Sequence, residues 1–319
     1  MSVAVLCGGV GAARFLRGLL GIVPAGDVTA IVNTGDDTQL HGLAISPDLD
    51  TITYTLAGAI DPERGWGLVD ETWRAMEALG RYAAVRPDGS TAAPTWFNLG
   101  DQDLATHFYR TARLAEGASL TDVTAEISRA WGLGVRLLPM TDQPIRTRVQ
   151  LADGDDVSFQ DYFVRLRHSV PVAGVSFDGA AELSSAADDS LRTADVVVVA
   201  PSNPIVSIGP IRQLPGVDGL LAARRQQVVA VSPIVGGAAL KGPADRMLAE
   251  LGVEPSVVGV ARLYAPIAAA LVIDPVDAEL ADAVAAEGIR PVVHPSIMAT
   301  QPAAESLARA TLSAAELAG

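Results

Sequence analysis

Four aspartates between residues 36 and 50 are the side chains whose type and spacing most directly suggest chemistry. Asp36 and Asp37 follow an apolar run that predicts a strand, and open α/β sheets bind their ligands at such strand ends. If residues 46–51 are extended, the side chains of Asp48 and Asp50 point to the same side. Neighbouring carboxylates need a cation, a proton or hydrogen bonds to offset their repulsion. Because Mg²⁺ prefers oxygen ligands, the four aspartates predict a metal or catalytic site. The alternative is a set of solvated loop acids and helix caps.

A glycine-rich turn near the amino terminus is a second candidate, for binding phosphate. Residues 8–11 read Gly-Gly-Val-Gly, after an apolar run and before apolar positions with helical spacing. Glycines permit a tight turn and let a phosphate approach backbone N–H groups at the start of a helix. A dinucleotide fingerprint would continue from Gly9 and Gly11 to a third glycine, but Arg14 stands there. We therefore expect nucleotide phosphates rather than a nicotinamide cofactor. A plain strand-to-helix turn is the alternative.

Two proline-stiffened loops follow strand-like runs in the second half of the chain. The first, residues 200–211, carries the short polar side chains of Ser202, Asn203 and Ser207 between three prolines and a glycine. The second, residues 232–237, follows the next strand-like run. Rigid loops at strand ends can hold a base edge or a phosphate. Such loops are otherwise simple turns.

The four histidines are scattered, and none has the spacing of zinc ligands, which disfavours a zinc site. His107 lies in a polar stretch, 98–107, that could face a ligand. The alternative for this stretch is that Asp101 or Asp103 caps a helix.

These side chains need a scaffold, and the apolar runs of the chain predict one. Alternating strand-like and helical patterns predict an α/β fold with a Rossmann-like, doubly wound parallel sheet. Runs of β-branched residues without polar breaks are typical of parallel strands that are buried on both faces. Strands are expected at 2–6, 28–33, 194–200, 228–232, 270–274 and 290–294, and helices at 12–20, 120–131, 243–251 and 277–287.

The middle of the chain has a different character. Residues 61–189 hold all four tryptophans and a polar stretch at 86–94. The acidic turn at 152–156 predicts a hairpin between 147–151 and 157–159. We interpret 61–189 as an inserted, largely helical subdomain that covers one side of the sheet, and 1–60 with 190–319 as the nucleotide-binding core.

Composition excludes several classes of protein. The 319 residues include 37 acidic and 23 basic ones, for a net charge of -14, so a general nucleic-acid binder is not expected. Lys241, the only lysine, does not stand in a P-loop motif. With Cys7 as the only cysteine, the chain cannot form an internal disulfide or a multi-cysteine metal site. No apolar stretch is long enough to span a membrane and no signal peptide is recognisable, so we expect a cytoplasmic protein.

Taken in order, these motifs resemble one family, the 2-phospho-L-lactate transferases of coenzyme F-420 biosynthesis, whose actinobacterial members use phosphoenolpyruvate in place of phospholactate. Each motif is short, but their order over most of the chain is specific. The segments that carry the resemblance are 8–11, 33–37, 46–51, 99–101, 105–107, 138–140, 159–161, 201–204, 207–210 and 232–234.

The resemblance implies a reaction. A guanosine-diphosphate-activated three-carbon acid, lactyl or enolpyruvyl, donates its phosphorylated acid to the ribityl hydroxyl of the deazaflavin Fo, and GMP leaves. The product is F-420 without glutamates or its dehydro form. The resemblance also implies Mg²⁺ as the metal and a homodimer, and it leaves open which of the two donors this chain uses.

The same resemblance assigns roles to individual residues. Asp36 and Asp48 would be the Mg²⁺ ligands with Asp37 beside them, and Asp50 would contact the deazaflavin and orient or deprotonate its hydroxyl. Gly9, Gly11 and Arg14 would line the nucleotide phosphates. The guanosine side is assigned to Ser202, Asn203, Ser207 and Gly209, and further substrate contacts to Asn33, Asn98, Thr106 and His107. Trp66 or Trp96 could stack on the deazaflavin, with core packing as the alternative.

The sequence departs from the family pattern at two positions. Asn98 stands where some relatives have a basic residue, and Gln102 stands where relatives often have arginine. Two other functions compete with the transferase: an NAD(P)-dependent oxidoreductase, suggested by the glycine turn, and a nucleotide-binding regulator without catalysis. Arg14 and the paired aspartates argue against the oxidoreductase.

Overall fold

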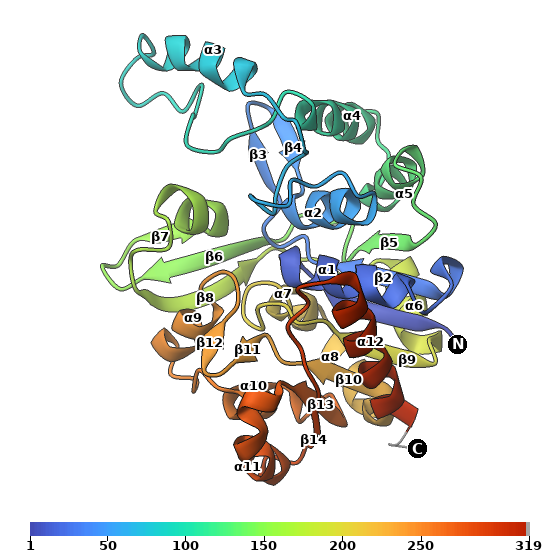
Figure 1. The fold of residues 1–319 in the computed structure, drawn as a ribbon. Coiled ribbons are helices and arrows are strands. Elements are labelled where there is room, and N and C mark those ends of the chain that lie inside the picture. Colours follow the sequence, from blue (N-terminus) through green and yellow to red (C-terminus); the bar gives the residue numbers. More distant parts are fainter. Residues whose placement is uncertain (317–319) are drawn as a thin grey trace.

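A parallel seven-stranded sheet forms the centre of the protein in the computed structural model, which describes residues 1–316 (Figure 1). The strand order is β14-β13-β10-β9-β1-β2-β5, and all neighbours pair in parallel. The predicted doubly wound parallel sheet is therefore confirmed. The strands are β1 (Val3–Cys7), β2 (Val28–Val32), β5 (Arg136–Pro139), β9 (Val196–Val199), β10 (Val228–Val231), β13 (Ala270–Ile273) and β14 (Arg290–Val293).

The alternation of side chains along each strand fills two hydrophobic cores, one on each face of the sheet. In β1, Val3, Val5 and Cys7 belong to one core, and Ala4 and Leu6 to the other. The first core is covered by α1 (Gly9–Leu20), α2 (Pro47–Leu56), α5 (Leu120–Ala130) and α12 (Gln301–Glu316). The second is covered by α6 (Ser185–Thr193), α7 (Gly209–Gln213), α8 (Val217–Ala223), α9 (Ala244–Glu250), α10 (Val257–Tyr264) and α11 (Ala281–Ala286).

The chain reverses its direction across the sheet between β1 and β9. From β1 it proceeds outward through β2 to β5, and it then returns to β9 on the other side of β1. The loops that leave β1 and β9 diverge to opposite faces, and doubly wound sheets bind their ligands at such a switch point. The glycine turn follows β1 and the first proline-stiffened loop follows β9, so both lie at this switch point.

The segment 61–189 contributes one strand to the central sheet and also forms a small sheet of its own. It supplies β5, which pairs with β2 at the sheet edge, so part of it belongs to the core. It holds the helices α3 (Arg74–Ala83), α4 (Asp103–Ala115) and α5, but also an antiparallel sheet in the order β7-β6-β8. The predicted hairpin is confirmed as β6 (Arg146–Leu151) with β7 (Asp156–Ser158), and β8 (Val172–Asp178) pairs on the other side of β6. The segment is therefore largely helical, as predicted, and also contains a small antiparallel sheet.

Two local predictions differ from the structure. Residues 46–51 are not extended, because α2 begins at Pro47, and proline at the first helical position is pre-organised for a helix. The helix expected over 277–287 is a 3₁₀ segment, Pro275–Leu280, followed by α11.

The remaining elements are short. Hairpins are formed by β3 (Thr38–Leu40) with β4 (Leu43–Ile45), and by β11 (Ile234–Val235) with β12 (Ala238–Ala239). Further 3₁₀ turns lie at Ala25–Asp27 and Arg225–Gln227, and a π-helical turn at Asp161–Arg165. Within residues 1–316, no helix has the length and apolar character required to cross a bilayer.

Candidate active site

Gly8, directly after β1, is the point at which the predicted site segments meet. A methyl group added there would lie 2.5 Å from Asp48 Oδ2, 3.0 Å from Ser207 Cβ and 3.2 Å from Asn33 Cβ. The hydroxyl of Ser202 accepts a hydrogen bond from the Gly8 N–H (3.3 Å) and donates one to the Gly8 carbonyl (2.9 Å). The fold thus brings together the glycine turn, the loop after β2, the first turn of α2 and the loop after β9.

Asp36 and Asp48 share one hydrogen-bond donor. Asn33 Nδ2 lies 2.6 Å from Asp36 Oδ1 and 2.9 Å from Asp48 Oδ2, and all three side chains are buried. Burial raises the pKa of Asp48 to about 6. Burial and the charge of Asp48 raise the pKa of Asp36 well above its ordinary value. We call Asp36 and Asp48 the carboxylate pair.

The carboxylate pair lacks a positively charged partner among residues 1–316. Neither member forms an ion pair with an arginine, a lysine or a histidine there. Next to it, Asp37 Oδ2 accepts a hydrogen bond from Ser46 (2.7 Å), while Asp37 Oδ1 is buried without a partner in the described part of the chain. Burial raises the pKa of Asp37 as well. Clustered carboxylate oxygens with an unsatisfied member fit a hard divalent cation such as Mg²⁺.

Asp50 lies on another side of the same helix. Consecutive residues of an α-helix are turned by about 100°, so positions two apart, such as Asp48 and Asp50, diverge. The two oxygens of Asp50 bind the guanidinium of Arg110: Nη1 lies 3.1 Å from Oδ2, and Nη2 contacts Oδ1. His107 Nδ1 lies 3.7 Å from Asp50 Oδ2. Asp50 is therefore compensated by a buried cation, unlike the carboxylate pair.

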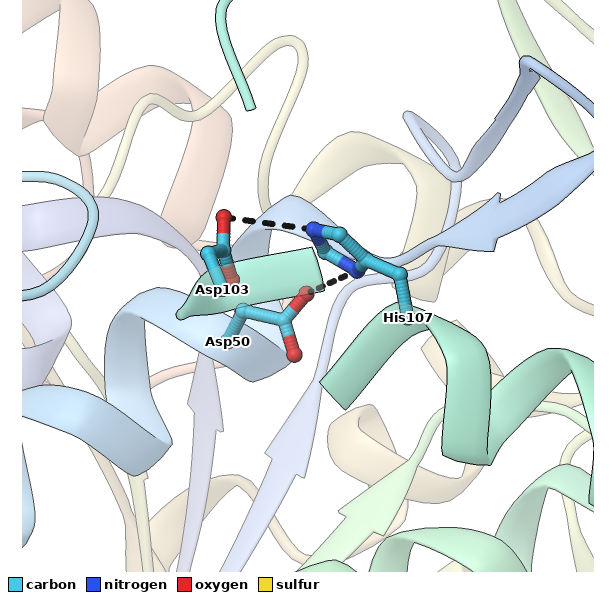
Figure 2. A group of neighbouring side chains, drawn as sticks. All are labelled: Asp50, Asp103 and His107. Carbon is cyan, nitrogen blue, oxygen red and sulfur yellow. Dashed lines mark ion pairs between the residues drawn. The ribbon is translucent and has the colours of Figure 1, made fainter. Parts of the chain in front are cut away.

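The partners of Asp50 come from one face of α4. Asp103, His107 and Arg110 follow each other at helical spacings of four and three residues. Figure 2 shows His107 between the carboxylates of Asp103 and Asp50, with its Nε2 3.2 Å from Asp103 Oδ2. On its other side, Asp103 Oδ1 accepts a hydrogen bond from the Tyr54 hydroxyl (2.6 Å). We call Asp50, Tyr54, Asp103, His107 and Arg110 the α4 network.

The α4 network offers a second arrangement of potential metal ligands. One ligand atom from each of Asp50, Asp103 and His107 lies within 4.8 Å of the others. However, the guanidinium of Arg110 already supplies a positive charge there, and it contacts both Asp50 and His107. Although burial acts in the opposite direction, the nearby His107 ring lowers the pKa of Asp103. The charge of Asp50 is thus compensated within the network, and the carboxylate pair is the better cation site.

The other residues expected to line the nucleotide phosphates lie in the first half of α1. Gly9 has a left-handed φ of 73°, and a methyl group on Gly11 would lie 2.3 Å from the Pro201 carbonyl. Arg14 is exposed on α1. Burial and the nearby Arg14 guanidinium lower the pKa of Lys241.

The loop after β9 uses part of its polar groups internally. The side-chain oxygen of Asn203 accepts hydrogen bonds from the N–H groups of Ile205 (2.9 Å) and Val206 (3.4 Å). Ser202 is likewise engaged with Gly8. Ser207 faces Gly8, and Gly209 begins α7 with Phe177 Cζ 3.2 Å from the position of an added methyl group. The loop is therefore held rigid by its own side chains.

Several predicted residues lie elsewhere. Asn98 is exposed, and Thr106 is buried on α4. Trp66 is partly exposed and packs against Trp73, while Trp96 packs against Phe97. Asp101 accepts hydrogen bonds from the first N–H groups of α3, so it caps that helix.

Arg110 and Tyr54 were missed by reasoning from the sequence. A weak signal existed for Arg110: if this stretch is helical, the spacing of Asp103, His107 and Arg110 places three ionisable side chains on one face. Nothing in the spacing shows that this face meets α2. The contact joins residues 60 positions apart, Asp50 and Arg110, and depends on how the two helices pack.

Comparisons with known proteins identify the family and agree with the fold. The family model of 2-phospho-L-lactate transferase CofD matches residues 3–312. A phosphoenolpyruvate transferase of Streptomyces griseus is 43% identical over 322 residues, with 99% of each chain covered. The phosphoenolpyruvate transferase of Mycolicibacterium smegmatis is 39% identical over 328 residues, with 98% of each chain covered. Among solved structures, a UPF0052 family member from Bacillus halodurans shares the fold with a TM-score of 0.60 at 14% identity, over 98% of each chain.

Proposed function

The chain belongs to the 2-phospho-L-lactate transferase CofD family, and we propose that it transfers a phosphorylated three-carbon acid from a guanosine-diphosphate-activated donor to the deazaflavin Fo. The observation that carries this proposal is the carboxylate pair beside the glycine turn, at the switch point of the sheet. The names of the relatives support the enolpyruvyl donor over the lactyl one. The product would then be the dehydro form of coenzyme F-420 without glutamates.

The proposed reaction is a displacement at phosphorus. The terminal ribityl hydroxyl of Fo attacks the phosphorus that carries the three-carbon acid, and a new P–O bond forms. The bond between that phosphorus and the bridging oxygen breaks, and GMP leaves with the electron pair. The hydroxyl proton passes to Asp50 or to water. Such a transfer depends on positioning and on neutralisation of charge more than on covalent chemistry by the protein.

The carboxylate pair is the proposed Mg²⁺ site, with Asp37 beside it. Its buried, uncompensated oxygens fit this ion, which would supply positive charge to the donor diphosphate and to the departing GMP phosphate. The start of α1 offers the N–H groups of Gly9 and Gly11 to the donor phosphates, and Arg14 adds a positive charge on the same helix.

The loop after β9 is proposed to hold the guanosine. Because Ser202 and Asn203 are engaged within the protein, they shape the loop, and Ser207 and the backbone remain for the ligand. The homodimer implied by the family resemblance stays a prediction, which analytical ultracentrifugation can test. The oxidoreductase alternative is disfavoured because Arg14 occupies the third position of the glycine fingerprint on α1.

The decisive experiment incubates the purified protein with Fo and each guanosine-diphosphate-activated acid, with and without EDTA, and follows GMP. We expect Mg²⁺-dependent GMP release, faster with the enolpyruvyl donor. Absence of metal-dependent GMP with both donors would refute the proposal. Faster release with the lactyl donor would refute only the choice of donor.

A further inference from the structure

We propose that Arg110 is a positioning residue that fixes the Asp50 carboxylate for the acceptor hydroxyl, and that His107 supports Arg110 instead of binding substrate. The inference rests on the proposed function, because that function places Asp50 at the acceptor. It assigns a role to Arg110, and it replaces the substrate-binding role that the family resemblance implied for His107.

Arg110 holds Asp50 by a two-point contact. Its guanidinium contacts both carboxylate oxygens, and only 2% of the Arg110 side chain is exposed. A two-point contact between a planar guanidinium and a carboxylate fixes the rotation of the carboxylate as well as its position. Each Asp50 oxygen keeps a second lone pair, which remains available to accept a hydrogen bond from a substrate hydroxyl.

His107 is enclosed by neighbouring side chains of the protein. Its ring is 1% exposed, and Nδ1 lies 3.3 Å from Arg110 Nη1. Because a guanidinium can only donate, Nδ1 is the acceptor of this contact, and the neutral ring carries its proton on Nε2. Nε2 faces Asp103 Oδ2 at 3.2 Å, and Asp103 is held in turn by Tyr54. Despite this proximity, Nε2 forms no hydrogen bond among residues 1–316; because only 1% of the side chain is exposed, neither ring nitrogen is open to a substrate.

The first test is a double-mutant cycle between Arg110 and Asp50. We expect Arg110→Met to lower kcat by about 100-fold, the cost of a small misplacement of a reacting group. In an Asp50→Asn background the same change is expected to cost less than about threefold, because Arg110 acts through Asp50. Binding of GDP, measured by calorimetry, should stay within about twofold. Arg113→Met is the matched control: Arg113 lies on the same helix but pairs with Glu116 and Glu126 near the surface.

Several results would overturn the positioning role of Arg110. The first is an unchanged kcat in Arg110→Met. The second is a kcat in the double mutant that falls by the product of the two single-mutant losses. The third is a loss of GDP affinity in Arg110→Met as large as its loss of kcat. If Arg110→Met does not fold, Arg110→Lys carries the test, since it keeps the charge but loses the two-point contact; we expect an intermediate kcat. No transfer by the wild type would refute the proposed function itself, whereas transfer with independent losses refutes only the positioning role.

The second test separates positioning from substrate binding at His107. Glutamine can accept from Arg110 and donate to Asp103, so His107→Gln should keep kcat within about threefold. His107→Leu should lower kcat by about tenfold, in the range for lost supporting contacts, without raising the KM for Fo. A raised KM for Fo with unchanged kcat in His107→Leu would show that His107 is a substrate ligand and overturn the assignment.

Discussion

Two groups of buried carboxylates lie on different sides of α2, and they differ in how their charge is balanced. The carboxylate pair, Asp36 and Asp48, has hydrogen-bond donors but no ion-pair partner among residues 1–316, and its pKa values are raised. The α4 network holds Asp50 and Asp103 against a buried arginine and a histidine. Buried charge without a partner is costly, so it is kept where a ligand supplies the partner. Buried charge with a partner serves to hold geometry.

The largest effect is expected when one member of the carboxylate pair is neutralised. Asp48→Asn keeps the shape of the side chain but removes a proposed Mg²⁺ ligand and its charge. We expect turnover to fall by about 1000-fold or more, because the removed group stabilises charge in the transition state. GMP release is the measurement, and circular dichroism is the control for folding. Normal GMP release by this variant would eliminate Asp48 as a metal ligand.

The second change breaks the α4 network instead. Arg110→Met leaves Asp50 and Asp103 buried without their cation, and it should lower the free energy of unfolding by about 3–5 kcal/mol. Urea denaturation measures this loss. In the same assay, Arg113→Met should leave the free energy of unfolding nearly unchanged, since its ion pairs are partly exposed to solvent. If both variants lost the same free energy of unfolding, the buried Arg110 and the more exposed Arg113 would not differ as proposed.

The third prediction concerns pH and uses the raised pKa of Asp48. Its value of about 6 in the folded protein exceeds the ordinary 3.8, so the folded state holds a proton that the unfolded state has lost between these two pH values. The contribution of Asp48 to stability is therefore full below pH 3.8 and is lost as the pH rises through 6. The shift in the pKa of Asp48 corresponds to a change of about 3 kcal/mol in the free energy of unfolding across this pH range.

Thermal unfolding of the metal-free protein at several pH values measures how its stability depends on pH. A parallel series with added Mg²⁺ measures the effect of the metal. Mg²⁺ should stabilise the wild type more at pH 7 than at pH 5, because it replaces the proton. Asp48→Asn should reduce both the pH slope and the effect of Mg²⁺. The same slope in wild type and variant would show that Asp48 is not the group responsible.

The smallest expected effect is at the edge of the α4 network. Tyr54→Phe removes the hydroxyl that donates to Asp103 Oδ1, and it should lower the free energy of unfolding by about 1–2 kcal/mol. Because His107 still faces Asp103, activity should fall by less than about threefold. If Tyr54→Phe lowered kcat as much as Arg110→Met, Tyr54 would be as important as Arg110 for holding the network in place.

Much of the architecture could be predicted from the sequence because parallel strands buried on both faces leave an unambiguous apolar pattern. The runs at β9, β10 and β13 were recognisable in this way. The location of the site also followed, since the polar loops come directly after strands and strand ends share one edge of the sheet. The antiparallel sheet within 61–189 was harder to anticipate, because β8 lies more than 20 residues from β6 and no local turn signals their pairing.

The fold class, the glycine turn and the presence of aspartates at the switch point follow from the order of residues along the chain. How those aspartates divide into two groups depends on how the helices pack. Asp48 and Asp50 point to different sides because Pro47 starts a helix, so Asp48 joins Asp36 while Asp50 meets Arg110. The physical reason is that charge compensation in a core depends on which helix faces pack together, and α4 meets α2 through contacts between residues distant in the chain.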